Sequence, residues 1–199
     1  MTALETAKFA LERDEKELDI ISRDMVKIEK TDKVDGILAR YRITVNLGDK
    51  NTYIIRKGSD TPEPVNKITF YADVPYTYPQ CAVRVYFGTK QGLYHVNTWN
   101  DDNHRQCIDV WTKYSSIKSV IEKTLRAILY DEDVCRYESM ANSLAKNWQQ
   151  KKVREGEFPI YPSSVLFRKS IDISKPSVKR TKSVKTNPRC HPVVRKVIA

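Results

Sequence analysis

The sequence lacks the features that mark membrane-spanning, secreted and zinc-ribbon proteins. No apolar run approaches the roughly 18 residues of a transmembrane helix, and the stretch MTALETAKFALERDEKELD carries acids where a secretory signal has a compact apolar core. The four cysteines, Cys81, Cys107, Cys135 and Cys190, form no C-x-x-C pair. Scattered thiols favour a reducing compartment over a disulfide framework. We therefore expect a cytoplasmic protein with no membrane partner.

Acidic residues are scarce in the last quarter of the chain. Residues 151–199 hold 13 Lys and Arg against 3 Asp and Glu, whereas residues 1–150 hold 22 of each kind. The net charge of +10 therefore belongs to the end of the chain. Residues 174–192 contain no acid, and such a composition is typical of an extended or disordered segment. We predict a folded domain over residues 1–158 and a basic tail over residues 159–199.

The first half of the chain shows one helical period and then the period of strands. Apolar residues recur near a heptad spacing over residues 3–22, which predicts an N-terminal helix. Apolar and polar residues then alternate, as in half-buried strands, over 37–47, 53–55, 68–74 and 83–87. Short turns separate these segments, so we predict a four-stranded antiparallel meander with one buried face.

Helical spacing returns in the second half. Apolar residues at 117–129 step alternately by three and one, which predicts an amphipathic helix. After an acidic break at 131–133, apolar residues from Val134 to Trp148 predict a second helix. The order of helix, four strands, long polar connection and helices predicts an α+β domain whose sheet is covered by helices.

The polar connection, YHVNTWNDDNHRQCIDVW at 94–111, concentrates groups that could perform chemistry. His95, His104 and Cys107 could in principle bind zinc with a nearby aspartate. The spacing of nine between the two histidines matches no common zinc pattern, so we expect no metal and no cofactor. A free cysteine most often fills buried space, and composition alone leaves Cys107 open between that role and a nucleophile.

Four short motifs stand at the joints between the predicted elements. They are YP at 78–79, HVN at 95–97, CIDVW at 107–111 and YSS at 114–116. In that order they resemble the Tyr-Pro pair, the His-Pro-Asn motif, the catalytic Cys-Leu-Asp-Ile-Leu stretch and the Trp-Ser-Pro motif of the ubiquitin-conjugating enzyme family. The resemblance implies the fold of that family.

The resemblance spans residues 4–155 and is strongest over 68–129. Three features depart from the family pattern: valine replaces the proline of the His-Pro-Asn motif, the acidic loop lacks a Pro-Asn-Pro run, and the connection from Asn97 to Cys107 is longer. Divergent members of the family, prokaryotic ones among them, depart in similar ways. The longer connection raises the question of whether Asn97 still lies against Cys107.

The activity that the resemblance implies is acyl carriage. The thiolate of Cys107 accepts the C-terminal acyl group of ubiquitin or a ubiquitin-like protein from an activating enzyme, because only the thiolate attacks. The amine of a target lysine then attacks this thioester, with or without a ligase. Asn97 is expected either to donate a hydrogen bond to the oxyanion or to brace the loop.

The resemblance also assigns roles to polar residues around these two. Asp131 and Asp133 occupy the place of the acid that helps the incoming lysine lose its proton, and Asp133 is preferred because it lies deeper in the loop. Asp133 could instead cap the next helix. His95 is expected to support the active-site loop structurally, and His104 is expected to be a solvated loop residue.

Three other interpretations stay open. A catalytically silent interaction module of the same fold usually lacks the cysteine, which is present here. Nucleic-acid binding through residues 175–199 would act by counterion release, but that segment has no aromatic residue for base stacking. A Cys–His hydrolase would need His95 to reach Cys107 and a third group to orient it. A conjugating enzyme that binds neither nucleic acid nor a membrane remains the leading prediction.

Overall fold

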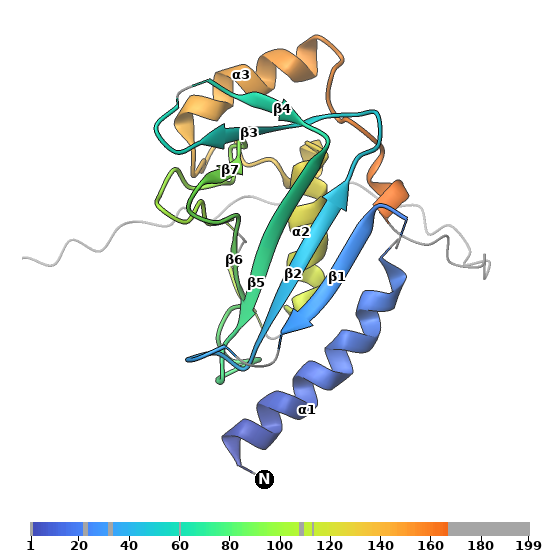
Figure 1. Ribbon diagram of the computed structural model, residues 1–199, viewed down its shortest axis with the longest axis vertical. Helices are drawn as coiled ribbons and strands as arrows, with labels where there is room; N and C mark the ends of the chain where they lie inside the picture. Colours follow the sequence, from blue (N-terminus) through green and yellow to red (C-terminus); the bar gives the residue numbers. More distant parts are fainter. Residues whose placement is uncertain are drawn as a thin grey trace, which may run out of the picture.

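The chain folds as an α+β domain with an N-terminal helix, antiparallel sheets and further helices, and this coarse architecture confirms the predicted fold class (Figure 1). The computed structural model describes residues 2–21, 24–31, 34–59, 61–107, 110–112 and 114–166. Most of the predicted tail lies outside these ranges, and so does the segment 175–199 on which the nucleic-acid interpretation depends.

Within the described ranges, an N-terminal helical segment is followed by strands up to residue 93 and by helices from residue 117. In chain order the elements are α1 (Ala3–Glu15), the 3-10 helix η1 (Lys16–Ile20), β1 (Val26–Thr31), β2 (Ala39–Asn46), β3 (Thr52–Arg56), β4 (Glu63–Val65), β5 (Lys67–Val74), β6 (Arg84–Tyr86), β7 (Gln91–Leu93), α2 (Ile117–Ile128), η2 (Glu132–Val134), α3 (Ser143–Arg154) and η3 (Ser163–Leu166). None of the described helices is long and apolar enough to cross a membrane.

The main sheet has the strand order β1-β2-β5-β6, and every neighbouring pair is antiparallel. Burial alternates along β2 and β5, so one face of the sheet is apolar. Ile43 of β2 lies opposite Phe70 of β5, and both are fully buried. Helix α2 covers this face and lies behind the sheet in the view of Figure 1.

The predicted four-strand meander is wrong in two respects. Strand β3 leaves the main sheet and pairs with β4 and β7 in a second, three-stranded sheet. Its adjacent residues Ile54 and Ile55 point to opposite sides and are both buried, each in a different apolar cluster. Both faces of β3 are therefore covered, whereas a strand of the predicted meander would have one face exposed to solvent. Strand β1 was missed because only Val26 in it is fully buried, and its pairing with β2 holds it in place.

The second predicted helix begins nine residues later than its apolar pattern suggests, at Ser143 rather than Val134. The side chain of Asn142 caps α3 by accepting the N–H groups of Leu144 and Ala145. Before this cap, Ala141 and Asn142 both donate their N–H groups to the carbonyl of Val96. The intervening apolar residues pack on the second cluster from an irregular segment, which imitates a helical period in the sequence.

The folded domain continues beyond the predicted boundary at residue 158. Leu166 is completely buried, and the N–H of Ile160 donates to the carbonyl of Leu129 over 3.0 Å. The hydroxyl of Tyr161 also donates to the carbonyl of Leu47 over 3.1 Å. These contacts join residues 160–166 to the main core, so the domain extends at least to Leu166.

Tyr78 joins three elements that position the candidate site. Its buried hydroxyl donates to the carboxylate of Asp14 on α1 and accepts the N–H of Ile117 at the start of α2, with an N···O distance of 3.2 Å. Trp111 packs on the Tyr78 ring, and its indole N–H donates to the carbonyl of Pro79 over 2.7 Å. The chain that follows Cys107 is therefore anchored to a fixed loop.

Candidate active site

The chain between Asn97 and Cys107 closes into a short antiparallel ribbon. The N–H of Cys107 donates to the carbonyl of Asn97 over 2.6 Å, and the N–H of Trp99 donates to the carbonyl of Arg105 over 2.8 Å. The extra length of the connection is taken up inside the turn at 100–104. The two residues that the sequence pattern singled out therefore lie directly opposite each other.

Asp101 closes the turn of this ribbon. One oxygen of its carboxylate accepts the N–H groups of Asn103 and Arg105, each over 3.2 Å, and the other accepts the Nε–H of Arg105. Burial opposes ionisation of Asp101, but these hydrogen bonds outweigh it and lower the pKa of the carboxyl. Such side-chain to backbone bonds are the usual way in which aspartate stabilises a turn.

The ribbon also extends the main sheet, which fixes the direction of the thiol. Thr98 and Gln106 form its central bridge, are both buried, and are joined by a hydrogen bond of 3.0 Å between their side chains. Arg105 forms a second antiparallel bridge with Tyr86 of β6. Side chains alternate along extended backbone, so Cys107 lies on the outer face with Arg105, and its side chain is partly exposed.

The side chain of Asn97 braces the loop after α2. Its Nδ2 donates to the carbonyl of Val134, and its Oδ1 accepts the N–H of Arg136 over 3.1 Å. The residue is almost completely buried. Of the two roles that the sequence left open, the contacts of Asn97 match bracing, and the second N–H of Nδ2 is the remaining donor for an oxyanion.

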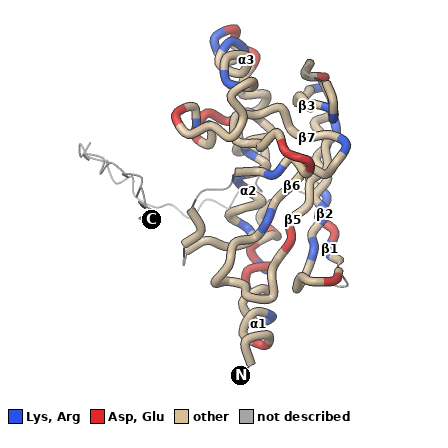
Figure 2. Tube along the Cα trace, turned by 90° about the vertical axis from the view of Figure 1, so that its left-hand side faces the viewer, with Lys and Arg blue, Asp and Glu red and all other residues tan. Residues whose placement is uncertain are grey.

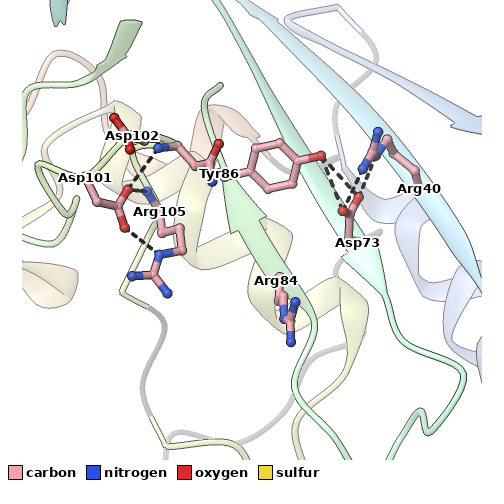
Figure 3. A pocket seen from close by; sticks show the side chains of 8 residues that line it. Arg40, Asp73, Arg84, Tyr86, Asp101, Asp102 and Arg105 are labelled. Atoms are coloured by element: carbon pink, nitrogen blue, oxygen red, sulfur yellow. Dashed lines mark hydrogen bonds and ion pairs between the residues drawn. The ribbon is translucent and has the colours of Figure 1, made fainter. Parts of the chain in front are cut away.

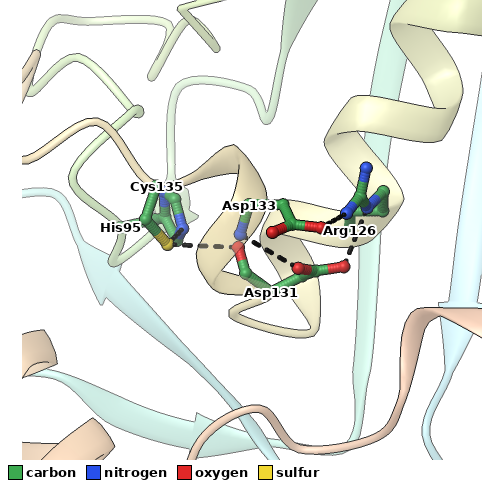
Figure 4. A network of polar contacts seen from close by, with 5 residues as sticks. All are labelled: His95, Arg126, Asp131, Asp133 and Cys135. Atoms are coloured by element: carbon green, nitrogen blue, oxygen red, sulfur yellow. Dashed lines mark hydrogen bonds and ion pairs between the residues drawn. The ribbon is translucent and has the colours of Figure 1, made fainter. Parts of the chain in front are cut away.

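His95 lies fully buried beneath this loop (Figure 4). Its Nδ1 accepts the N–H of Asn97 over 3.0 Å, and its Nε2 lies 3.4 Å from the sulfur of Cys135. Burial lowers the pKa of His95 to about 3, so the ring is neutral at pH 7. These contacts are those of a residue that supports the active-site loop.

Cys135 makes polar contacts that no motif of the sequence indicates. Its sulfur lies 2.8 Å from Nε2 of Gln149 and 3.3 Å from the carbonyl of Asp131. Burial raises the pKa of Cys135 to about 11. The Cys–His contact of the described residues thus joins Cys135, not Cys107, to His95, and it is a neutral pair rather than a thiolate with an imidazolium.

Asp131 and Asp133 both bind Arg126 of α2, as Figure 4 shows. Their carboxylates lie 2.8 Å from its Nε and from one of its terminal nitrogens, respectively. Burial opposes ionisation of Asp131, but the Arg126 hydrogen bond helps to lower its pKa. The Asp131 side chain is 13% exposed and that of Asp133 is 82% exposed, so Asp133 is the accessible acid. The capping role considered for Asp133 falls to Asp131, which caps η2.

His104 is not the solvated residue that the sequence suggested. It is buried, and its ring packs against Gly92 of β7, where an added Cβ would lie 2.3 Å from the histidine Cγ. Because Gly92 has no side chain, the ring of His104 can occupy this position. The spacing of apolar residues in the sequence does not indicate the burial of His104. Burial lowers the pKa of His104. Its Nε2 has no hydrogen-bond partner among the residues that the structure describes.

Exposed apolar residues lie near Cys107 in the sequence and on the ribbon. Val110 and Tyr114 are each 83% exposed after it, and Trp99 is 46% exposed on the opposite arm of the ribbon. Residues 108 and 109 lie outside the described ranges. No group of three potential metal ligands converges anywhere in the described part of the chain. Cys107 is thus a partly exposed thiol with exposed apolar residues close to it in the chain.

No protein-family model matches the chain, and no curated protein matches it. The resemblance to ubiquitin-conjugating enzymes therefore depends on the motifs and on the arrangement of the residues that carry them.

Proposed function

We propose that this chain adopts the ubiquitin-conjugating fold and carries ubiquitin or a ubiquitin-like protein as a thioester on Cys107. The observation that carries the proposal is the ribbon that places Asn97 opposite Cys107, with 2.6 Å between the amide nitrogen of Cys107 and the carbonyl oxygen of Asn97. The two residues pair although the connection between them is longer than the one expected from the family pattern. A partly exposed thiol on the outer face supports the same role.

The reaction consists of two acyl transfers. In the first, the Cys107 thiolate attacks the C-terminal carbonyl carbon of the modifier, and the activating enzyme departs as the leaving group. In the second, a target lysine attacks the thioester carbon, loses a proton, and expels the Cys107 thiolate. The products are an amide-linked conjugate and free enzyme.

One hydrogen-bonded network supports both steps. The carbonyl of Asn97 holds Cys107, and the side chain of Asn97 holds the loop at Val134 and Arg136. The same short loop carries Asp133, whose exposed carboxylate is the candidate acceptor for the proton of the lysine. Fixing the loop therefore fixes the acid relative to the thiol.

A gel assay tests the proposal. Incubation with an activating enzyme, its modifier and ATP is expected to give a conjugate that reductant removes. Cys107→Ser is expected to give a conjugate that resists reductant, because an oxyester replaces the thioester. Cys81→Ser is the matched control, since Cys81 is an exposed thiol elsewhere on the surface, and it should behave as wild type. A reductant-sensitive conjugate of unchanged yield in Cys107→Ser contradicts the proposal.

The second candidate is a catalytically silent interaction module. Both polar atoms of the Asn97 side chain are hydrogen-bonded to the loop, and this favours the second candidate. A residue that only stabilises the loop is as useful in a binding protein as in an enzyme. Failure to form a conjugate with any cognate activating enzyme and modifier, in a folded protein with a free Cys107, would support this alternative.

A further inference from the structure

Charged residues of both signs are interspersed over the described body of the protein (Figure 2). Several of them gather in one groove of about 760 Å³ on the outer side of β5 and β6, beside the ribbon that ends at Cys107 (Figure 3). Tyr86 lies at its centre in the view of Figure 3. The charged residues that line the groove are Arg40, Asp73, Arg84, Asp101, Asp102 and Arg105.

The carboxylates of this groove are already engaged. Asp73 accepts two hydrogen bonds from Arg40, over 2.7 and 2.8 Å, and the hydroxyl of Tyr86 lies 3.3 Å from one of its oxygens. Asp101 accepts three hydrogen bonds within its own turn. Asp102 pairs with Lys57 over 3.1 Å. Asp73 and Asp101 thus have most of their acceptor positions occupied, whereas Asp102 is exposed and has one partner.

The guanidinium groups, in contrast, keep free donors. Each guanidinium group carries five N–H donors and has no hydrogen-bond acceptor. The side chain of Arg84 makes no hydrogen bond or ion pair with any residue that the structure describes, and in Figure 3 it extends away from the other labelled groups. Arg105 contacts Asp101 through Nε, which leaves its two terminal nitrogens. The formal charges of the groove balance as a whole, but the free donors gather at Arg84 and Arg105, so this part of the groove suits an anion.

We propose that this groove is a docking site for an acidic segment of a partner protein, whose carboxylates bind Arg84 and Arg105. A carboxylate fits better than a phosphate, because the nearby Asp73 and Asp101 repel a dianion more strongly than a single charge. The volume also exceeds the needs of one small anion and suits several residues of an extended chain. Arg105 and Cys107 share one face of the ribbon, so the bound segment would lie beside the thiol.

This proposal goes beyond acyl transfer and is tested without it. The probe is a fluorescein-labelled peptide of eight residues in which Glu and Gly alternate, and its polarisation is measured with the full chain at low salt. A peptide with Gln in place of Glu serves as the neutral probe. We expect Arg84→Glu and Arg84→Ala to weaken binding of the acidic peptide about tenfold or more, as loss of a charge-assisted contact does.

The control variant is Arg154→Glu, which changes the net charge as much as Arg84→Glu. Arg154 is an exposed residue of α3, far from the groove, and it forms no ion pair with the described residues. It should bind like wild type, and so should Cys107→Ser. If Arg84→Glu and Arg154→Glu weaken peptide binding equally, the peptide is attracted only by the overall charge, and the proposal is overturned. If neither substitution weakens peptide binding, the proposal is also overturned.

Two further readouts locate the peptide and identify its chemistry. Amide chemical-shift changes on titration are expected at residues 84–86 and 103–105. Changes confined to residues 167–199, which are rich in Lys and Arg, would overturn the proposal. Displacement of the peptide by inorganic phosphate, at concentrations where acetate has no effect, would assign the groove to phosphate and also overturn it.

Discussion

Cys107 and Cys135 are two cysteines with opposite environments. Cys107 is partly exposed on the outer face of a ribbon, opposite Asn97. Cys135 is enclosed by His95 and Gln149, and burial raises its pKa to about 11. The same burial lowers the pKa of His95 to about 3. At neutral pH Cys135 is therefore a protonated thiol beside a neutral imidazole, and of these two cysteines Cys107 is the one suited to nucleophilic attack.

Alkylation rates should separate the two thiols. At pH 7.5 we expect iodoacetamide to modify Cys107 about a hundredfold faster than Cys135, because a thiol with a pKa near 11 is almost entirely protonated there. The rate at Cys135 should rise about tenfold per pH unit up to its pKa. Mass spectrometry of the digested protein measures both rates. A Cys135 that reacts as fast as Cys107 at pH 7.5 would mean that the buried pair is ionised.

At the scale of elements, the candidate site is a junction between a ribbon and a loop. The ribbon extends β6 of the main sheet through the bridge between Tyr86 and Arg105. The loop follows α2 and is clamped to it by Arg126. The buried side chain of Asn97 joins the two. Removing this side chain takes away the two side-chain hydrogen bonds that join the ribbon to the loop at Val134 and Arg136.

Asn97→Ala tests this junction. The substitution leaves the carbonyl of Val134 and the N–H of Arg136 without their partner, which should lower the free energy of unfolding by about 1–3 kcal/mol. Asn100→Ala, on the exposed turn of the same ribbon, is the control and should change it little. Urea denaturation measures both. Equal stability of the two variants would show that Asn97 is not a brace.

Sequence period predicted the elements whose two faces differ in burial. Helix α2 and strands β2 and β5 have such faces. Period does not encode the partner of a strand, which is why β3 was assigned to the wrong sheet. Nor does it distinguish a helix from an irregular segment that places apolar residues at similar intervals, as residues 134–142 do before α3.

The candidate site was predictable in part for a similar reason. The motifs identified Asn97 and Cys107, but the number of residues between them could not show whether they meet. That depends on how Asp101 closes the turn, which is a property of its hydrogen bonds. The burial of His104 depends on space above Gly92, and the contact between Cys135 and His95 depends on two segments that meet only in the folded chain.

At the scale of the whole molecule, the domain ends later than composition suggested. Leu166 is buried in the main core. Ile160 is hydrogen-bonded to Leu129 at the end of α2, and Tyr161 is hydrogen-bonded to Leu47, which follows β2. The basic composition of the chain after residue 150 therefore overlaps with packed structure.

Truncation tests where the domain ends. A chain that ends at Leu166 should unfold at the same denaturant concentration as the full chain. A chain that ends at Phe158 should lose about 2 kcal/mol or more, since burial of one leucine contributes about that much. Chemical denaturation followed by tryptophan fluorescence compares them. If the shorter chain is as stable as the longer one, residues 160–166 do not belong to the core.

The central claim is that Cys107 is the acyl acceptor, and site-resolved mass spectrometry tests it most directly. After incubation with an activating enzyme, its modifier and ATP, the trapped conjugate is digested at low pH without reductant. We predict that the C-terminal residues of the modifier are found on the peptide that contains Cys107. Finding them on Cys81, Cys135 or Cys190 instead, or on a lysine alone with no thioester at Cys107 at any time, would contradict the claim.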